Sequence, residues 1–172
     1  MTSTQREPSD DTPIRVALYS DDRTVRAEAR AALGRRVAKD LPELEIEEFA
    51  TPAALLVAMR ETAYDLGLFD AEAVPLGGMG LSRQVRDELP FPPPAILLVA
   101  RPDDAWLAAW SRAEAISPYP IDPVRLPETV AAVLRADREG RDTLLPSTAD
   151  PAPGVSSQHD AHADDDPRPA AS

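Results

Sequence analysis

Between residues 14 and 136, short apolar runs alternate with segments of helical periodicity, and this alternation is the strongest constraint on the fold. The apolar runs predict strands at 14–20, 44–50, 64–70, 95–100 and 116–119. The other segments predict helices at 23–36, 53–62, 78–89, 102–115 and 126–136. Thr51 and Pro52 mark one helix start, because Thr caps a helix and Pro suits its first position. Five strand–helix units with right-handed crossovers give an α/β fold, a five-stranded parallel sheet with helices on both faces.

The two ends of the chain differ in composition from this core. Residues 1–12 are polar, and residues 137–172 are rich in Pro, Ala, Ser and Asp with few large apolar groups. Such segments bury too little surface to offset the entropy of ordering. We therefore expect a folded domain at 13–136 between a disordered N-terminus and a disordered acidic tail.

Charge and residue usage exclude several classes of function. The net charge is −12 and no basic stripe is present, which argues against a nucleic-acid partner because phosphate neutralisation drives such binding. There is no cysteine, and so no disulfide, thiolate zinc site or thiol catalysis. His159 and His162 both lie in the acidic tail, so no Ser/His/Asp arrangement converges in the core and we expect no enzyme. The two histidines are better explained as part of a solvated acidic tail than as ligands of a metal site.

No apolar run approaches the roughly 18 residues that a membrane helix needs. The N-terminal sequence is too polar for a secretory signal. These features predict a cytoplasmic protein with no membrane partner.

In a parallel sheet, the functional crevice lies at the carboxyl ends of the strands. The residues at those ends are Ser20, Asp21, Asp22, Asp70, Val99 and Tyr119. Asp70 is notable because it ends an otherwise apolar strand and precedes a glycine-rich loop. A plain interpretation is a loop aspartate that ends pairing and caps the next segment. Asp21 and Asp22 likewise suit the start of a helix, where negative charge is favoured.

The chain resembles the receiver domains of bacterial response regulators over about residues 14–136. Four motifs carry this resemblance in order: "VALYSDDRTVRAEARAAL", "YDLGLFDAEAVPLGGMGL", "PPAILLVARPDDAW" and "YPIDPVRL". The resemblance implies the flavodoxin-like (βα)5 receiver fold and a role in two-component, or phosphorelay, signal transduction.

The resemblance also implies a site. Working receivers hold Mg²⁺ with two adjacent acids and the aspartate that accepts phosphate. Aligned on Arg26, the acidic pair falls on Ser20 and Asp21, with Asp22 just after, and the acceptor falls on Asp70. One acid is thus replaced, so Mg²⁺ binding at Asp21, Asp22 and Asp70 is expected to be weak, and no cofactor is required.

Two further positions of this site are degenerate. The Thr or Ser of working receivers falls on Val99, and their Lys, just before Pro120, falls on Tyr119. Tyr119 is neutral at pH 7 and cannot neutralise a phosphoryl group. Val99 has no polar atom that could respond to phosphate, so phosphate would not shift the populations of two conformations.

Trp106 and Trp110 are the only tryptophans and are spaced i, i+4 on the predicted fourth helix. We expect one ring to pack on the sheet and the other to contribute to an exposed aromatic patch. The resemblance implies that helix four, strand five with Tyr119, and helix five form a partner or dimer face. Aromatic side chains are favoured anchors at such faces.

Together these observations predict a single-domain, atypical response regulator that acts by protein–protein docking largely independent of phosphorylation. The alternative is a genuine receiver in which a histidine kinase phosphorylates Asp70 through weak, Mg²⁺-dependent transfer. A homodimer remains open, as does a regulatory role for the acidic tail.

Overall fold

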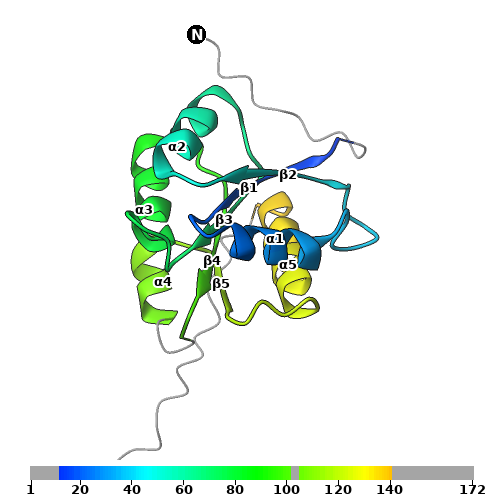
Figure 1. The fold of residues 1–172 in the computed structure, drawn as a ribbon. Coiled ribbons are helices and arrows are strands. Elements are labelled where there is room, and N and C mark those ends of the chain that lie inside the picture. The colour runs from blue at the N-terminus through cyan, green and yellow to red at the C-terminus, as the bar shows by residue number, and fades with distance from the viewer. Residues whose placement is uncertain (1–11, 102–104, 141–172) are drawn as a thin grey trace, which may run out of the picture.

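The computed structural model describes residues 12–101 and 105–140, and its centre is a five-stranded parallel sheet of order β2-β1-β3-β4-β5 (Figure 1). The strands are β1 (Ile14–Tyr19), β2 (Leu44–Phe49), β3 (Leu66–Asp70), β4 (Ala95–Val99) and β5 (Ala115–Pro118). The helices are α1 (Arg23–Leu33), α2 (Pro52–Glu61), α3 (Gly78–Glu88), α4 (Ala105–Ser111) and α5 (Arg125–Arg138). The predicted fold class is confirmed, with every element in its expected order.

Helices cover both faces of the sheet, and each face has its own apolar core. Helices α1 and α5 pack on one face, and α2 and α3 on the other, where α4 lies beside α3 (Figure 1). Alternate residues of each strand supply the two cores: Leu66 and Leu68 of β3 face α1 and α5, whereas Phe69 faces α2 and α3. Strands β3 and β4 are buried throughout, as expected for central parallel strands.

Local signals set the starts of two helices, α1 and α2. The Thr51 hydroxyl accepts a hydrogen bond of 3.3 Å from the backbone N–H of Ala54, and Pro52 is the first residue of α2, as predicted. Asp22 caps α1 in the same way, accepting from the N–H of Thr24 at 2.7 Å.

Two helix ends differ from the sequence prediction. Helix α1 ends at Leu33, before the predicted end at 36, because Gly34 takes a positive φ of 60°, which a helix cannot continue and which glycine tolerates. Helix α4 ends at Ser111 and β5 begins at Ala115, so the predicted helix over 102–115 is too long. Arg112 has φ of 57°, which stops the helix.

The predictions of disorder lie mostly outside the described residues. Helix α5 continues to Arg138, two residues past the predicted domain end at 136. Among the described residues, no helix has both the length and the apolar character that a membrane crossing requires.

Candidate functional site

Asp70 is the last residue of β3, and it is 3% exposed. Both carboxylate oxygens are engaged. Oδ2 accepts a hydrogen bond of 2.7 Å from the Ser20 hydroxyl, and Oδ1 accepts one of 2.9 Å from the backbone N–H of Glu72. The buried charge is therefore satisfied by two neutral donors, as a buried carboxylate requires.

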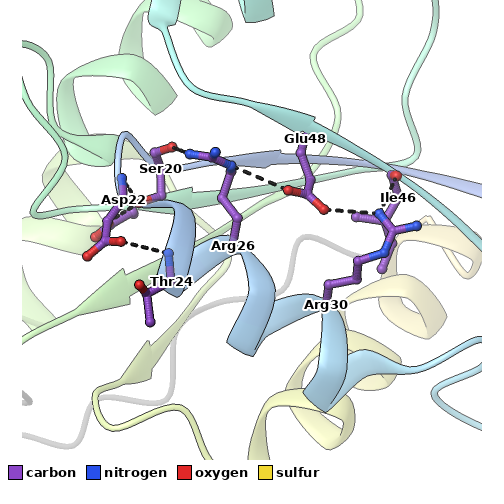
Figure 2. Close-up of polar contacts among 8 residues, drawn as sticks. Ser20, Asp22, Thr24, Arg26, Arg30, Ile46 and Glu48 are labelled. Carbon is purple, nitrogen blue, oxygen red and sulfur yellow. Dashed lines mark hydrogen bonds and ion pairs between the residues drawn. The ribbon is translucent and has the colours of Figure 1, made fainter.

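Ser20 directly follows β1 and is fully buried, and several hydrogen bonds fix its position, one of them from its N–H to the carbonyl of Phe49 at 3.2 Å. Besides donating to Asp70, its hydroxyl accepts from the N–H of Asp22 at 3.1 Å. Its carbonyl accepts from Nη1 of Arg26 at 2.6 Å (Figure 2). Ser20 is thus a structural link between α1 and the end of β3.

Arg26 extends this link to the edge of the sheet (Figure 2). Its Nε lies 3.4 Å from a carboxylate oxygen of Glu48 on β2, and the other oxygen of Glu48 pairs with Arg30 at 3.1 Å. Arg30 also donates to the carbonyl of Ile46 at 3.2 Å. The sequence analysis used Arg26 only to align the chain and did not identify Glu48. The position of Glu48 in a strand of alternating apolar and acidic residues could have indicated that it faces solvent and is free to pair with a cation.

The three acids predicted as metal ligands do not form one donor group. Asp22 is exposed and its carboxylate caps α1, Asp70 is held by Ser20 and Glu72, and Asp21 is exposed to solvent. Within residues 12–101 and 105–140, no three His, Asp or Glu side chains are placed to hold a metal ion. The donors present therefore do not fit a tightly bound Mg²⁺, which prefers several oxygen ligands in octahedral geometry.

Val99 ends β4 and Tyr119 follows β5, so the two predicted degenerate positions lie at the same edge of the sheet as Asp70. Val99 is buried in the core between the sheet and α2 and α3, and its carbonyl accepts from the N–H of Tyr119 at 2.8 Å. The Tyr119 hydroxyl is buried and makes no hydrogen bond of good geometry with the described residues.

Negatively charged carboxylates lie around Tyr119. Burial raises the pKa of Tyr119 well above its usual value. The Asp70 carboxylate raises this pKa further, through its negative charge and through a close contact with the hydroxyl whose geometry is too poor for a hydrogen bond. Glu72 and Asp22 act in the same direction. The side chain at this position is therefore a neutral phenol surrounded by negative charge.

A second tyrosine, which the sequence analysis missed, holds the loop after Asp70. The hydroxyl of Tyr19 donates to the carbonyl of Leu76 at 2.7 Å. A Cβ at Gly78 would lie 2.8 Å from the carbonyl oxygen of Asp70, so glycine lets α3 begin directly against β3. The sequence signal for this role was the position of Tyr19 as an aromatic residue at the end of an apolar strand.

The two tryptophans do not pack as predicted. Trp106 is 68% exposed and Trp110 is 51% exposed, so the expectation that one ring packs on the sheet is wrong. The guanidinium of Arg83 on α3 lies 4.7 Å from the ring centroid of Trp110. We call Arg83, Trp106 and Trp110 the tryptophan face. The hydroxyl of Tyr119, which was also predicted for this face, is buried and lies near Asp70.

The parallel sheet of order 2-1-3-4-5, with an aspartate at the end of the third strand, defines a receiver-like α/β protein. Solved structures share this fold. A CheY-like receiver domain protein from Methanospirillum hungatei superimposes with a TM-score of 0.62 and 19% identity, over 75% of this chain and 99% of that one. The chemotaxis response regulator CheY4 of Vibrio cholerae gives 0.60 and 20% identity, over 71% and 99%.

No protein-family model matches the chain. A protein of Mycobacterium tuberculosis, found in two strains and named an uncharacterized response regulatory protein, is 46% identical over 129 residues. The match covers 75% of this chain and 97% of that protein. The chain therefore belongs to the response regulator family and carries a receiver domain of two-component signalling.

Proposed function

We propose that the protein is a single-domain, atypical response regulator that acts by docking to a protein partner, largely independent of phosphorylation. In this proposal it is a cytoplasmic binding protein and performs no catalysis of its own. Neither nucleic acid nor membrane takes part.

The observation that carries the proposal is the state of Asp70. Its Oδ2 accepts from Ser20 and its Oδ1 from the N–H of Glu72, so both oxygens have partners without a cation. A phosphoryl group on Asp70 would meet the neutral Tyr119 and the apolar Val99. Charge stabilisation by positioned cations is the main source of catalysis in phosphoryl transfer. The described residues around Asp70 supply little of this charge stabilisation.

The tryptophan face supports docking as the mode of action. Two large rings with more than half of their surface exposed lie one turn apart on α4, and Arg83 covers part of one of them. Trp and Arg are the side chains most enriched among residues that dominate binding energy. The partner in this proposal is another protein, and a second copy of the chain is the alternative occupant.

One experiment tests the independence from phosphate. The protein is incubated with acetyl phosphate and Mg²⁺, and its intact mass is compared with that of Asp70→Asn. We expect no phosphoryl adduct on the wild-type protein, and we expect Asp70→Asn to retain the same proteins from a cell extract. The double variant Trp106→Ala/Trp110→Ala should lose them, whereas Val57→Ala, at an exposed apolar position on α2, should not.

The alternative function is slow acceptance of phosphate from a histidine kinase by Asp70. One observation favours it: after burial, the charges of Asp21 and Asp70 both raise the pKa of Tyr19, so both carboxylates lie within electrostatic reach of that side chain. A stoichiometric adduct that is absent from Asp70→Asn, together with altered partner retention, would establish this alternative and overturn our proposal.

A further inference from the structure

The loop that follows Asp70 is held in a fixed position next to the end of β4. The backbone N–H of Glu72 donates to Oδ1 of Asp70 at 2.9 Å, and the N–H of Ala71 donates to the carbonyl of Leu98 on β4 at 2.8 Å. Ala73, the next residue, is buried. The backbone on both sides of Glu72 is therefore anchored, and its side chain starts from a defined point.

The side chain of Glu72 crosses from this loop to the end of β4. In the parallel register Asp70 lies opposite Leu98, so Glu72 and Ala100 each lie two residues beyond a paired position. Oε1 of Glu72 accepts a hydrogen bond of 3.4 Å from the backbone N–H of Ala100. Because Ala100 lies past the end of β4, the carboxylate satisfies a backbone donor that the sheet does not use.

Glu72 also brings a negative charge to the crevice. None of the ion pairs among residues 12–101 and 105–140 includes this side chain. Its charge reaches the buried hydroxyl of Tyr119, where it adds to the effects of burial and of Asp70 in raising the pKa of that phenol. A phosphoryl group on Asp70 would therefore place further negative charge beside Glu72, and like charges disfavour one another.

We propose that Glu72 is a built-in anionic strap that ties the end of β4 to the loop after Asp70, in place of a phosphoryl group. The strap holds the end of β4 through the N–H of Ala100 whether or not Asp70 is modified. A ligand shifts a conformational equilibrium only if it contacts the two conformations differently. A phosphoryl group on Asp70 would therefore act on β4 only by displacing Glu72. This inference rests on the proposed function, because it gives a second reason why docking does not need phosphate.

The test follows the backbone N–H of Ala100 in the full chain by NMR, through its exchange rate with water and its chemical shift. Glu72→Ala should accelerate exchange by about fivefold, as expected when one exposed hydrogen bond is lost. Glu72→Gln should keep the exchange rate close to that of the wild type, because its amide oxygen can also accept. The matched control is Glu61→Ala, which removes an exposed glutamate at the end of α2 and should leave the Ala100 N–H unchanged.

Equal exchange rates for the wild type and Glu72→Ala would overturn the inference and leave the docking proposal standing. Acetyl phosphate and Mg²⁺ should leave the Ala100 N–H of the wild type unchanged. A phosphoryl adduct on Asp70 that shifts this N–H would overturn both proposals, because phosphate would then control the end of β4. An adduct without that shift would contradict only the expectation that Asp70 accepts no phosphate, and would support the strap.

Discussion

The hydroxyl of Ser20 donates a hydrogen bond of 2.7 Å to Oδ2 of Asp70, which joins the ends of β1 and β3 side chain to side chain. Both residues are buried, so this bond lies where the local dielectric is low and its loss is costly. The group that faces Asp70 is therefore a neutral hydroxyl. A second carboxylate in its place would repel Asp70 and would require a cation to balance the charge. Both oxygens of Asp70 have protein donors, which supports the proposal that no metal is required and leads to the first prediction.

Replacing Ser20 with Asp should make the fold dependent on a divalent cation. Two carboxylates would then face one another in a buried site, which should lower the free energy of unfolding by about 3 kcal/mol in metal-free buffer. Mg²⁺ should restore stability, by roughly 2.7 kcal/mol at a hundred times its dissociation constant. Thermal unfolding with and without Mg²⁺, at constant ionic strength, measures both effects.

Ser20→Asn is the matched control for that variant, since it adds similar bulk without charge. It should show no Mg²⁺-dependent stabilisation, and neither should the wild type. A wild-type shift as large as that of Ser20→Asp would show that the native donors already bind the ion.

The second prediction concerns the three tyrosines of the chain, which all have raised pKa values. Burial is the main cause for each, with added effects of Asp21 and Asp70 on Tyr19, of the hydrogen bond to Glu47 on Tyr64, and of Asp70 on Tyr119. A raised pKa means that the folded state keeps the phenol proton after the unfolded chain has lost it. The contribution of these groups is therefore fully present below about pH 10 and is lost as the pH rises further.

Alkaline titration followed by phenolate absorbance should show little ionisation near pH 10 while circular dichroism is native. Ionisation of the tyrosines should coincide with unfolding at higher pH. In denaturant, all of them should titrate near 10. Reversible ionisation of any tyrosine near pH 10 in the native protein would contradict the burial described for that residue.

Much of the fold could be predicted because its strands are strongly patterned. The run at 95–100 is wholly apolar, the run at 64–70 has Leu66, Leu68 and Phe69 at its centre, and Thr51–Pro52 is an unambiguous helix start. Helix ends were less predictable. Gly34, with a positive φ, ends α1, but Arg112 also has a positive φ at the end of α4 without any glycine signal. Both tryptophans of α4 are exposed to solvent, which the periodicity of the predicted helix did not indicate.

The site was predicted in position but not in its contacts. Parallel pairing of Tyr19 with Phe69 places the following residues, Ser20 and Asp70, side by side. That register depends on how the whole sheet packs and is not written in either strand alone. The sequence therefore identified Ser20 as a lost metal ligand, whereas the structure shows it as the donor that satisfies Asp70.

The third prediction concerns the ion pair between Asp40, in the connection before β2, and Arg135 on α5. Nε and Nη2 of Arg135 donate to the two carboxylate oxygens of Asp40 at 2.8 and 2.7 Å. The hydrogen bonds from Arg135 lower the pKa of Asp40 from 3.8 to about 2. A lowered pKa means that the stabilisation is present above the unfolded pKa and is lost as the pH falls from about 4 towards 2.

Arg135→Gln should return the pKa of Asp40 close to its ordinary value, which carboxylate chemical shifts between about pH 5 and pH 2.5 can measure. The variant should be less stable than the wild type near neutral pH, and the difference should shrink as the pH falls through this range. Arg138→Gln is the matched control on the same helix, because the charge of Arg138 is the weakest of the effects on Asp40. An Asp40 titration that is the same in the wild type and Arg135→Gln would mean that this surface pair is not formed in solution, which is common for exposed ion pairs.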